Sequence, residues 1–379
     1  MRLFTHFGRR ACAVLWVCMA GWAQAQGVSD KDIVLGMTLS LQGGKNSYGA
    51  AAAQGMALYF DQVNNAGGVN GRRIVTRVLD DDNQADKAVA NARQLVQDGA
   101  FILFSAIDGG PSTAVMKAAN DLGVPFFGPL AGSPTLRRPH QRLVFPVRAE
   151  HMDEFRALMV WGKSTGLSTL GFLHTDSEVG QQHLANVKLL AQELGMQVAV
   201  AIPFKGEITD AQLDQWVQAI GKSAPGMFIN HGGAGVYQRL VARAKGAGLK
   251  TSFMGVNSGS SQIVKALGPL AQGMVFAQVV PNPWVRKSPI AREYQDAVRA
   301  ASPQADFSYG ALEGYMTAKA MVMALRGAGR NLTRATLLTS LERGEFDLGG
   351  IKLTYRTGDH AGSRYVDLSM VSREGRFVH

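Results

Sequence analysis

The chain has 379 residues, of which 46% are hydrophobic and 18% are charged, and its formal net charge is +10. This length allows a large buried core and favours two domains over one. The basic residues are scattered, and their densest group, Arg137, Arg138 and Arg142, contains no interleaved aromatic residue, so we expect no nucleic-acid partner.

The first 25 residues have the pattern of a secretory signal peptide. Three arginines precede an uncharged apolar run over residues 11–21, and Ala23-Gln24-Ala25 follows as a small-residue cleavage pattern. We therefore expect residues 1–25 to be removed and the mature chain, from Gln26, to be exported to the periplasm. Both cysteines, Cys12 and Cys18, lie in this segment. The mature chain is then expected to have no disulfide, thiol nucleophile or thiolate metal site.

The region from about 28 to 149 alternates short apolar strands with amphipathic helices. In its first helix, Ala52, Met56, Phe60 and Val63 recur at helical spacing. The predicted strands are 33–39, 73–79, 101–105 and 124–127, and the predicted helices are 49–65, 84–97 and one that starts near Pro111.

The same alternation resumes over residues 150–278. The predicted strands are 170–173, 198–202, 227–229 and 252–255, and the predicted helices are 152–163, 178–194, 211–220 and 236–247. Repeated strand–helix units of this length indicate parallel sheets covered on both faces. We therefore expect an α/β fold with two Rossmann-like lobes.

The remainder, from residue 281, mixes three predicted helices (289–301, 309–325 and 333–342) with two predicted strands (351–355 and 366–372). We expect this tail to return to both lobes, so that the chain crosses three times and forms a hinge. The expected N-terminal lobe is 26–149 plus about 281–347. The expected C-terminal lobe is 150–280 plus about 348–379.

Ligands of open parallel sheets bind beyond the carboxyl ends of the strands. This rule selects loops 40–48, 105–112 and 129–133 in the first lobe, and 174–180, 230–235 and 257–261 in the second. The turn from Asp108 to Ser112 opens a helix and offers free N–H groups for a carboxylate, or is a plain strand-to-helix turn. Tyr48 either lines a pocket or packs on the first helix.

No catalytic motif is present in the expected mature chain. It has no cysteine, no G-x-S-x-G, no G-x-G-x-x-G and no histidine pair at metal-ligand spacing. The acidic run that starts at Asp80 lacks the glycine and glutamate of a calcium loop. Glu150-His151 with Asp153-Glu154 fits the start of a helix better than a metal site. We expect no enzyme activity, no cofactor and no metal.

Several segments resemble one known protein family. They are Val63 to Arg72, with its N-x-x-G-G-x-x-G-R turn, then Leu79-Asp80-Asp81, Gly123 to Pro129, Tyr309 to Tyr315, and Phe346 to Gly350. From about Asp32 to its C-terminus, the chain resembles the periplasmic substrate-binding proteins of branched-chain amino-acid-type ABC importers. This leucine/isoleucine/valine-binding group has the type I periplasmic-binding-protein fold.

The resemblance implies that two first-lobe loops clamp a ligand carboxylate. The corresponding residues here are Asp108, Gly109, Gly110, Ser112, Leu130, Ala131, Gly132 and Ser133. The family often has a hydroxyl residue near Gly109, and its absence leaves backbone donors and Ser112. Tyr48 matches the family's first-loop aromatic residue, whereas the aromatic wall of the second lobe is missing near Val179.

The resemblance also implies a glutamate near Asn257, where leucine-type binders pair the ligand's ammonium group. Asn257 cannot supply that charge. Either Asp176, on a facing loop, takes over the role, or the ligand is a carboxylate without an amine. His231 and Gly232 complete the candidate ligand-binding residues of the second lobe.

These expectations describe a transport receptor. It would capture an amino acid or related small carboxylate, close around it, and dock as a monomer on an ABC permease in the cytoplasmic membrane. The alternative is a ligand sensor of the same fold that signals to a regulator or sensor kinase.

Overall fold

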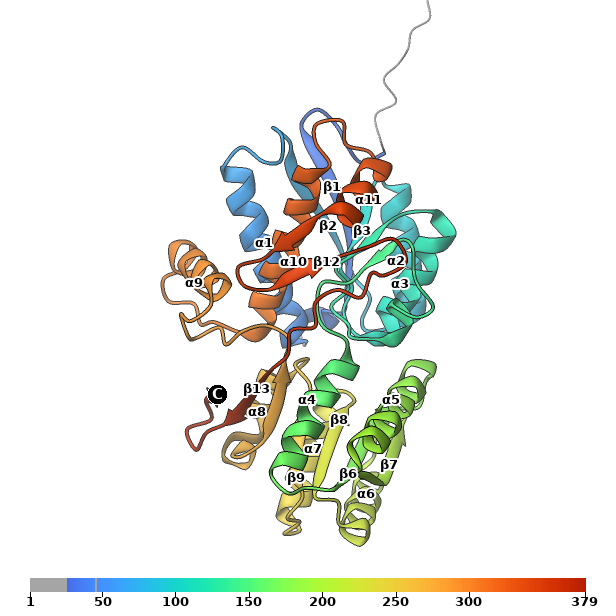
Figure 1. Ribbon diagram of the computed structural model, residues 1–379, viewed down its shortest axis with the longest axis vertical. Coiled ribbons are helices and arrows are strands. Elements are labelled where there is room, and N and C mark those ends of the chain that lie inside the picture. The colour runs from blue at the N-terminus through green and yellow to red at the C-terminus, as the bar shows by residue number, and fades with distance from the viewer. Residues whose placement is uncertain (1–25, 45) are drawn as a thin grey trace, which may run out of the picture.

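The computed structural model describes residues 26–44 and 46–379, so the expected signal peptide lies outside the described residues. In this part of the chain, two α/β lobes lie one above the other along the long axis of Figure 1. No helix among the described residues is long and apolar enough to cross a membrane.

The first lobe is built on a five-stranded parallel sheet. Its strand order is β2-β1-β3-β4-β5. Strand β1, which lies between β2 and β3, buries four alternating side chains, Ile33, Leu35, Met37 and Leu39. The strands are β1(Asp32–Leu39), β2(Arg73–Asp80), β3(Ile102–Phe104), β4(Phe126–Phe127) and β5(Val144–Phe145). The helices between them are η1(Gln42–Gly44), α1(Ser47–Asn65), α2(Ala85–Gln97), α3(Gly109–Leu122) and η2(Pro134–Leu136).

The second lobe is built on a seven-stranded sheet. Its order is β14-β13-β10-β9-β8-β6-β7, parallel from β7 to β10 and antiparallel at β13 and β14. The strands are β6(Thr169–Thr175), β7(Gln197–Phe204), β8(Met227–His231), β9(Ser252–Gly255), β10(Val275–Gln278), β13(Asp367–Val371) and β14(Phe377–Val378). The helices are α4(His151–Ser164), α5(Glu178–Leu194), α6(Asp210–Ser223), α7(Ala234–Gly246), α8(Ser260–Leu267) and η3(Gly268–Ala271).

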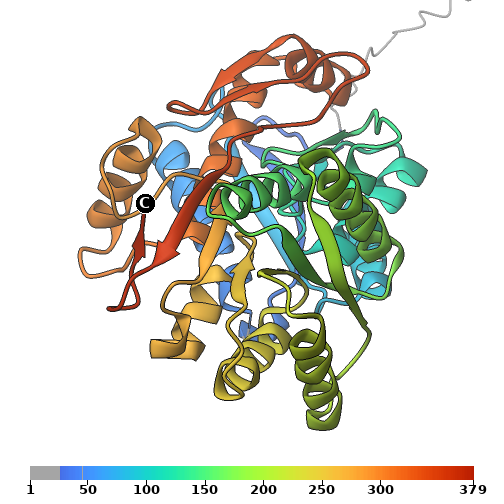
Figure 2. The same ribbon diagram turned by 60° about the horizontal axis from the view of Figure 1, so that its bottom comes forward.

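The C-terminal tail returns to both lobes. Helices α9(Pro289–Ala301), α10(Tyr309–Gly327) and α11(Arg334–Arg343), with the strand pair β11(Glu345–Asp347) and β12(Lys352–Thr354), pack on the first lobe. Strands β13 and β14 then join the second sheet (Figure 2). Because Leu348, Leu353 and Tyr355 belong to the first-lobe core, the chain leaves that lobe after Tyr355, and not near residue 348 as expected from the sequence.

The chain therefore passes between the two sheets three times, over residues 146–150, 279–288 and 355–366. The first and third passages are tied together by buried Arg137, which donates hydrogen bonds to the carbonyl oxygens of Arg148 (2.9 Å) and Ala361 (3.1 Å). Tyr355 also donates to the carbonyl oxygen of Pro146 (2.8 Å). We call the three passages together the hinge region; these bonds connect its first and third passages to each other.

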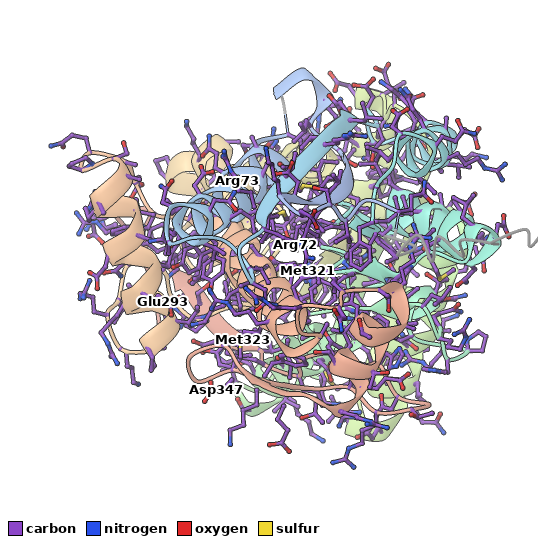
Figure 3. The ribbon with its side chains drawn as sticks, turned by 90° about the horizontal axis from the view of Figure 1, so that it is seen from above. Arg72, Arg73, Glu293, Met321, Met323 and Asp347 are labelled. Carbon is purple, nitrogen blue, oxygen red and sulfur yellow. The ribbon has the colours of Figure 1, made fainter. Side chains whose placement is uncertain are left out.

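Helix α10 runs through the first lobe against α1, and two glycines set the distance between them. A Cβ atom on Gly55 would lie 1.9 Å from the carbonyl oxygen of Ala311, and one on Gly314 would lie 2.1 Å from that of Ala52. Side chains at these positions would push the helices apart. Viewed onto the first lobe, Met321 of α10 lies centrally, while Glu293 and Asp347 lie nearer the edge (Figure 3).

Candidate ligand site between the lobes

The loops that follow the parallel strands of the first lobe face those of the second lobe. We call this region between the two lobes the junction. Ser47 at the start of α1 donates a hydrogen bond to Gln262 of α8 (3.4 Å). On the other side, Lys117 of α3 and Glu178 of α5 form an exposed ion pair of 3.7 Å. The rims of the two lobes are therefore in contact, as expected from the strand-end rule.

The centre of the junction holds a buried ionic network that sequence reasoning missed. Arg148, from the first passage, donates to Glu154 of α4 (2.6 Å) and lies 3.5 Å from Glu313 of α10. All three side chains are fully buried. Arg148 also donates to Ser258 (3.2 Å). This guanidinium links carboxylates of both lobes to the hinge.

Two predicted site residues complete this network. Tyr48 donates its hydroxyl hydrogen to Glu313 (2.7 Å). Asn257 donates from its side-chain amide to the same Glu313 oxygen (2.6 Å) and from its backbone N–H to Glu154 (2.9 Å). Glu313, in the first lobe, thus accepts one hydrogen bond from Tyr48 of its own lobe and one from Asn257 of the second lobe. The bond from Asn257 joins the two lobes directly.

The network contains two carboxyl groups, those of Glu154 and Glu313, but only one guanidinium group, that of Arg148. Burial raises the pKa of Glu154 and Glu313, and Arg148 opposes this rise. Burial also lowers the pKa of the neighbouring His151, with Arg148 adding to the effect, so that His151 is neutral at pH 7. Two carboxyl groups then share one guanidinium. The junction favours either a bound proton or an additional cationic group next to Glu313.

Several buried polar atoms at this junction have no hydrogen-bond partner among the described residues. They are the hydroxyl oxygens of Ser105, Ser112 and Ser133, and single oxygens of Asn257 and Glu313. Buried polar groups in proteins nearly always have a partner, because an unpaired one loses its interactions with water. The three hydroxyl groups of the first lobe are therefore available as donors to a ligand.

The glycine turn at the start of α3 lies close to the second lobe. A Cβ atom on Gly109 would lie 2.6 Å from the Ser133 hydroxyl oxygen and 3.2 Å from a methyl carbon of Val179. The Ser133 hydroxyl group, on the adjacent loop, therefore lies beside Gly109, where the family often has a hydroxyl residue of its own. The space around the Cβ position of Gly110 is open.

Asp108 precedes this turn in an unusual conformation. Its φ of 64° and ψ of 156° lie in a region that favours glycine. Burial raises its pKa to about 6, with a contribution from Asp81 and an opposing one from Arg148. A strained, electrostatically perturbed residue at a helix start is typical of functional sites.

The other predicted residues of the first lobe divide into two kinds. The side chains of Leu130 and Ala131 belong to the apolar cores, so they offer only backbone groups to the junction. The carbonyl oxygen of Gly132 accepts a hydrogen bond from the backbone N–H of His151 (2.9 Å). A Cβ atom on Gly132 would collide with His151. Among these four residues, only Ser133 has a buried hydroxyl group without a hydrogen-bond partner among the described residues.

In the second lobe, Asp176 lies at an exposed position. Its side chain is exposed and accepts a hydrogen bond from Gln181 (3.5 Å), whereas the carboxylate beside Asn257 is that of Glu313. Gly232 accepts a bond from Asn230 (3.1 Å), and its Cβ position faces Phe204. His231 lies among other histidines. One sequence signal could have found Glu313, because it is the single acidic residue in the apolar helix α10.

Comparisons with known proteins agree with this architecture. The sequence matches a family model described as periplasmic binding protein over residues 32–376. The leucine-, isoleucine-, valine-, threonine- and alanine-binding protein of Pseudomonas aeruginosa is 27% identical over 266 residues, which cover 68% of this chain and 69% of that protein.

Solved structures share the fold. The extracellular ligand-binding receptor from Verminephrobacter eiseniae superimposes with a TM-score of 0.82 at 25% identity, covering 92% of this chain and 100% of that one. The fatty acid ABC transporter substrate-binding protein from Thermomonospora curvata gives a TM-score of 0.83 at 23% identity, covering 94% and 92%.

Proposed function

Since the chain belongs to the periplasmic binding protein family, we propose that it is the substrate-binding protein of an ABC importer and captures an amino acid or a related small carboxylate between its lobes. The observation that carries this proposal is the junction itself. It combines unpartnered hydroxyl groups in one lobe with a surplus buried carboxylate that contacts both lobes.

The first-lobe groups suit a ligand carboxylate. Ser105, Ser112 and Ser133 each have a buried hydroxyl without a partner among the described residues. Ser112 lies in the first turn of α3, where the helix dipole favours negative charge. A carboxylate at this position would accept from the hydroxyl groups and remove the cost of leaving them unpaired.

The charge of the network favours a ligand that also carries an ammonium group. One Glu313 oxygen has no hydrogen-bond partner among the described residues, although it lies 3.5 Å from Arg148, and the network holds one guanidinium for two carboxyl groups. An α-amino acid would supply the missing cation. We therefore assign to Glu313 the ammonium-pairing role that the sequence alone suggested for Asp176, and we favour an amino acid over an amine-free acid.

Lobe closure follows from the same contacts. The bond from Asn257 to Glu313 joins the two lobes and would be lost if they separated about the hinge region. A ligand that contacts both lobes favours the closed form by its difference in affinity for the two states. We propose that this closed form is the one that a permease recognises in the cytoplasmic membrane.

The proposal is tested with the mature protein, residues 26–379, in thermal unfolding with matched pairs of ligands. Leucine and its amine-free counterpart isocaproate form one pair, and alanine and propionate form another. A ligand at 100 times its Kd stabilises the folded state by about 2.7 kcal/mol. We expect stabilisation by one or more amino acids and none by the matched acids. Stabilisation by the acids alone would overturn the role of Glu313.

Uptake measurements test the transport role separately from binding. Deletion of the gene should abolish high-affinity uptake of the labelled ligand by intact cells. Normal uptake in the deletion strain, with binding intact in the purified protein, would instead support the sensor alternative.

A further inference from the structure

Three histidine side chains from separate elements converge in the second lobe. His151 is the first residue of α4, His183 lies on α5, and His231 ends β8. One ring nitrogen from each lies within 4.8 Å of the other two. The ring centroids are 3.8 Å apart for His183 and His231, 4.5 Å for His151 and His231, and 5.2 Å for His151 and His183.

The inner members of this cluster have ring nitrogens without protein partners. His183 is fully buried, and neither its Nδ1 nor its Nε2 has a hydrogen-bond partner among the described residues. Nδ1 of partly buried His231 has none either. Buried histidines that serve only packing normally bond at least one nitrogen to a backbone or side-chain group. These nitrogens point instead to a bound group that accepts lone pairs.

The third member, His151, is held in one tautomer. Its Nδ1 lies 2.6 Å from a carboxylate oxygen of Glu154, which Arg148 also contacts at 2.6 Å. An ionised carboxylate only accepts hydrogen bonds, so Nδ1 carries the proton and Nε2 keeps its lone pair. A carboxylate behind a histidine is the usual support for a metal-ligating imidazole, because it fixes the ring and increases its basicity.

We propose that His151, His183 and His231 form a three-imidazole site for a divalent transition metal ion, with a fourth position left for water or a ligand group. The site lies in the second lobe, next to the ionic network. The proposal of a metal site does not depend on the function proposed above. Its donors are all nitrogens, which suit Zn²⁺, Ni²⁺ or Cu²⁺ rather than Ca²⁺ or Mg²⁺.

The geometry is compatible with this ion class. A Zn–N bond of about 2.1 Å puts two tetrahedral ligands about 3.4 Å apart, so small ring rotations within the 4.8 Å limit would close the site. Burial lowers the pKa of all three histidines, which keeps them in the neutral form that binds metals. Phe155 lies against the cluster, with its ring centroid 5.6 Å from that of His183.

All three proposed ligands belong to the second lobe, so an ion would stay bound whether the lobes are open or closed. The site is nevertheless linked to the junction. Glu154 contacts both His151 and Arg148, and the backbone N–H of His151 donates to the carbonyl oxygen of Gly132 in the first lobe. This placement predicts metal binding without any small-molecule ligand present.

The test uses tag-free mature protein from which metals have been removed with a chelator. Equilibrium dialysis against Zn²⁺, followed by elemental analysis, should give one ion per chain. Co²⁺ should bind with the visible absorption of a nitrogen-ligated, low-coordination ion, and Zn²⁺ should displace it. Failure of the stripped wild-type protein to bind either ion at micromolar concentration would overturn the proposal.

Variants locate the ion. His183→Gln and the less buried His231→Gln should each weaken Zn²⁺ binding by about 10-fold or more. His360→Gln is the matched control, because His360 is also buried but stacks on Phe145 outside the cluster. Circular dichroism without metal checks that each variant folds. If His183→Gln does not fold, the result for His231→Gln decides whether the histidines bind the ion. An unchanged Zn²⁺ affinity in a folded His231→Gln variant would place the ion elsewhere.

Discussion

Replacing Glu313 by glutamine should weaken amino-acid binding strongly while leaving the folded protein nearly as stable. Glu313 accepts hydrogen bonds from Tyr48 (2.7 Å) and Asn257 (2.6 Å) and lies 3.5 Å from Arg148. Glutamine has the same shape and keeps one acceptor oxygen but carries no charge. Arg148 retains its closer partner Glu154 at 2.6 Å, so no buried charge is left alone. We expect a change in unfolding free energy of about 1 kcal/mol or less.

The loss in affinity follows from the ammonium group that Glu313 is proposed to pair. Hydrogen bonds that involve charged groups contribute about 1.5–3 kcal/mol. Removing the charge should therefore raise the Kd of an α-amino acid by about 10- to 150-fold. Titration calorimetry of the variant against the tightest-binding amino acid measures this change directly. Glu293→Gln is the control, because that carboxylate binds Lys319 and Tyr315 on the first lobe, away from the junction.

The pH dependence gives a second signature. Burial raises the pKa of Glu313, so the ligand-free protein keeps a proton there up to a higher pH than an exposed carboxyl group would. A bound ammonium favours the ionised form, and binding should then release a proton. Affinity should rise with pH over the range in which Glu313 titrates, and the slope should vanish in Glu313→Gln. Unchanged amino-acid affinity in a folded Glu313→Gln variant would refute the assignment.

Three further predictions concern the fold and the junction. Gly314→Ala should lower the unfolding free energy in urea by about 1–3 kcal/mol, because the new Cβ would collide with α1, whereas Gly246→Ala, with open space around it, should change it by less than about 1 kcal/mol. Asp108→Asn should stabilise the protein at pH 7 by up to about 2 kcal/mol but not at pH 4. Burial raises the pKa of Asp108 to about 6, so the folded protein favours the protonated form at low pH. As pH rises through 6, Asp108 ionises at a buried position and the free energy of unfolding falls. An equal effect of the substitution at both pH values would contradict this. Asn257→Ala should remove the bond to Glu313 and shift the ligand-free protein toward an open form, measured as a longer distance between spin labels on α3 and α5; an unchanged distance would show that this bond does not hold the lobes together.

The sequence determined the elements of this protein where local periodicity is strong. Helix α9 has the bounds expected from its pattern, and β1, β2 and α5 begin and end within two residues of expectation. Helices α5 and α9 each bury one face, and their apolar residues recur at the helical period. Helix α8 and the short strands β5 and β11 were not predicted. Two- or three-residue strands show no period of their own and form by pairing with neighbours.

The tertiary structure decided which charged residues meet. Tyr48 and Asn257 were predicted as site residues, because the strand-end rule selects their loops and the family resemblance singles out these two positions. Glu313 was not, since its position depends on the docking of α10 against α1 by close glycine contacts. The same holds for His151, His183 and His231, which are far apart in the chain and adjacent only in the folded lobe. Periodicity specifies which face of an element is buried, whereas the packing of remote elements determines which polar groups share that interior.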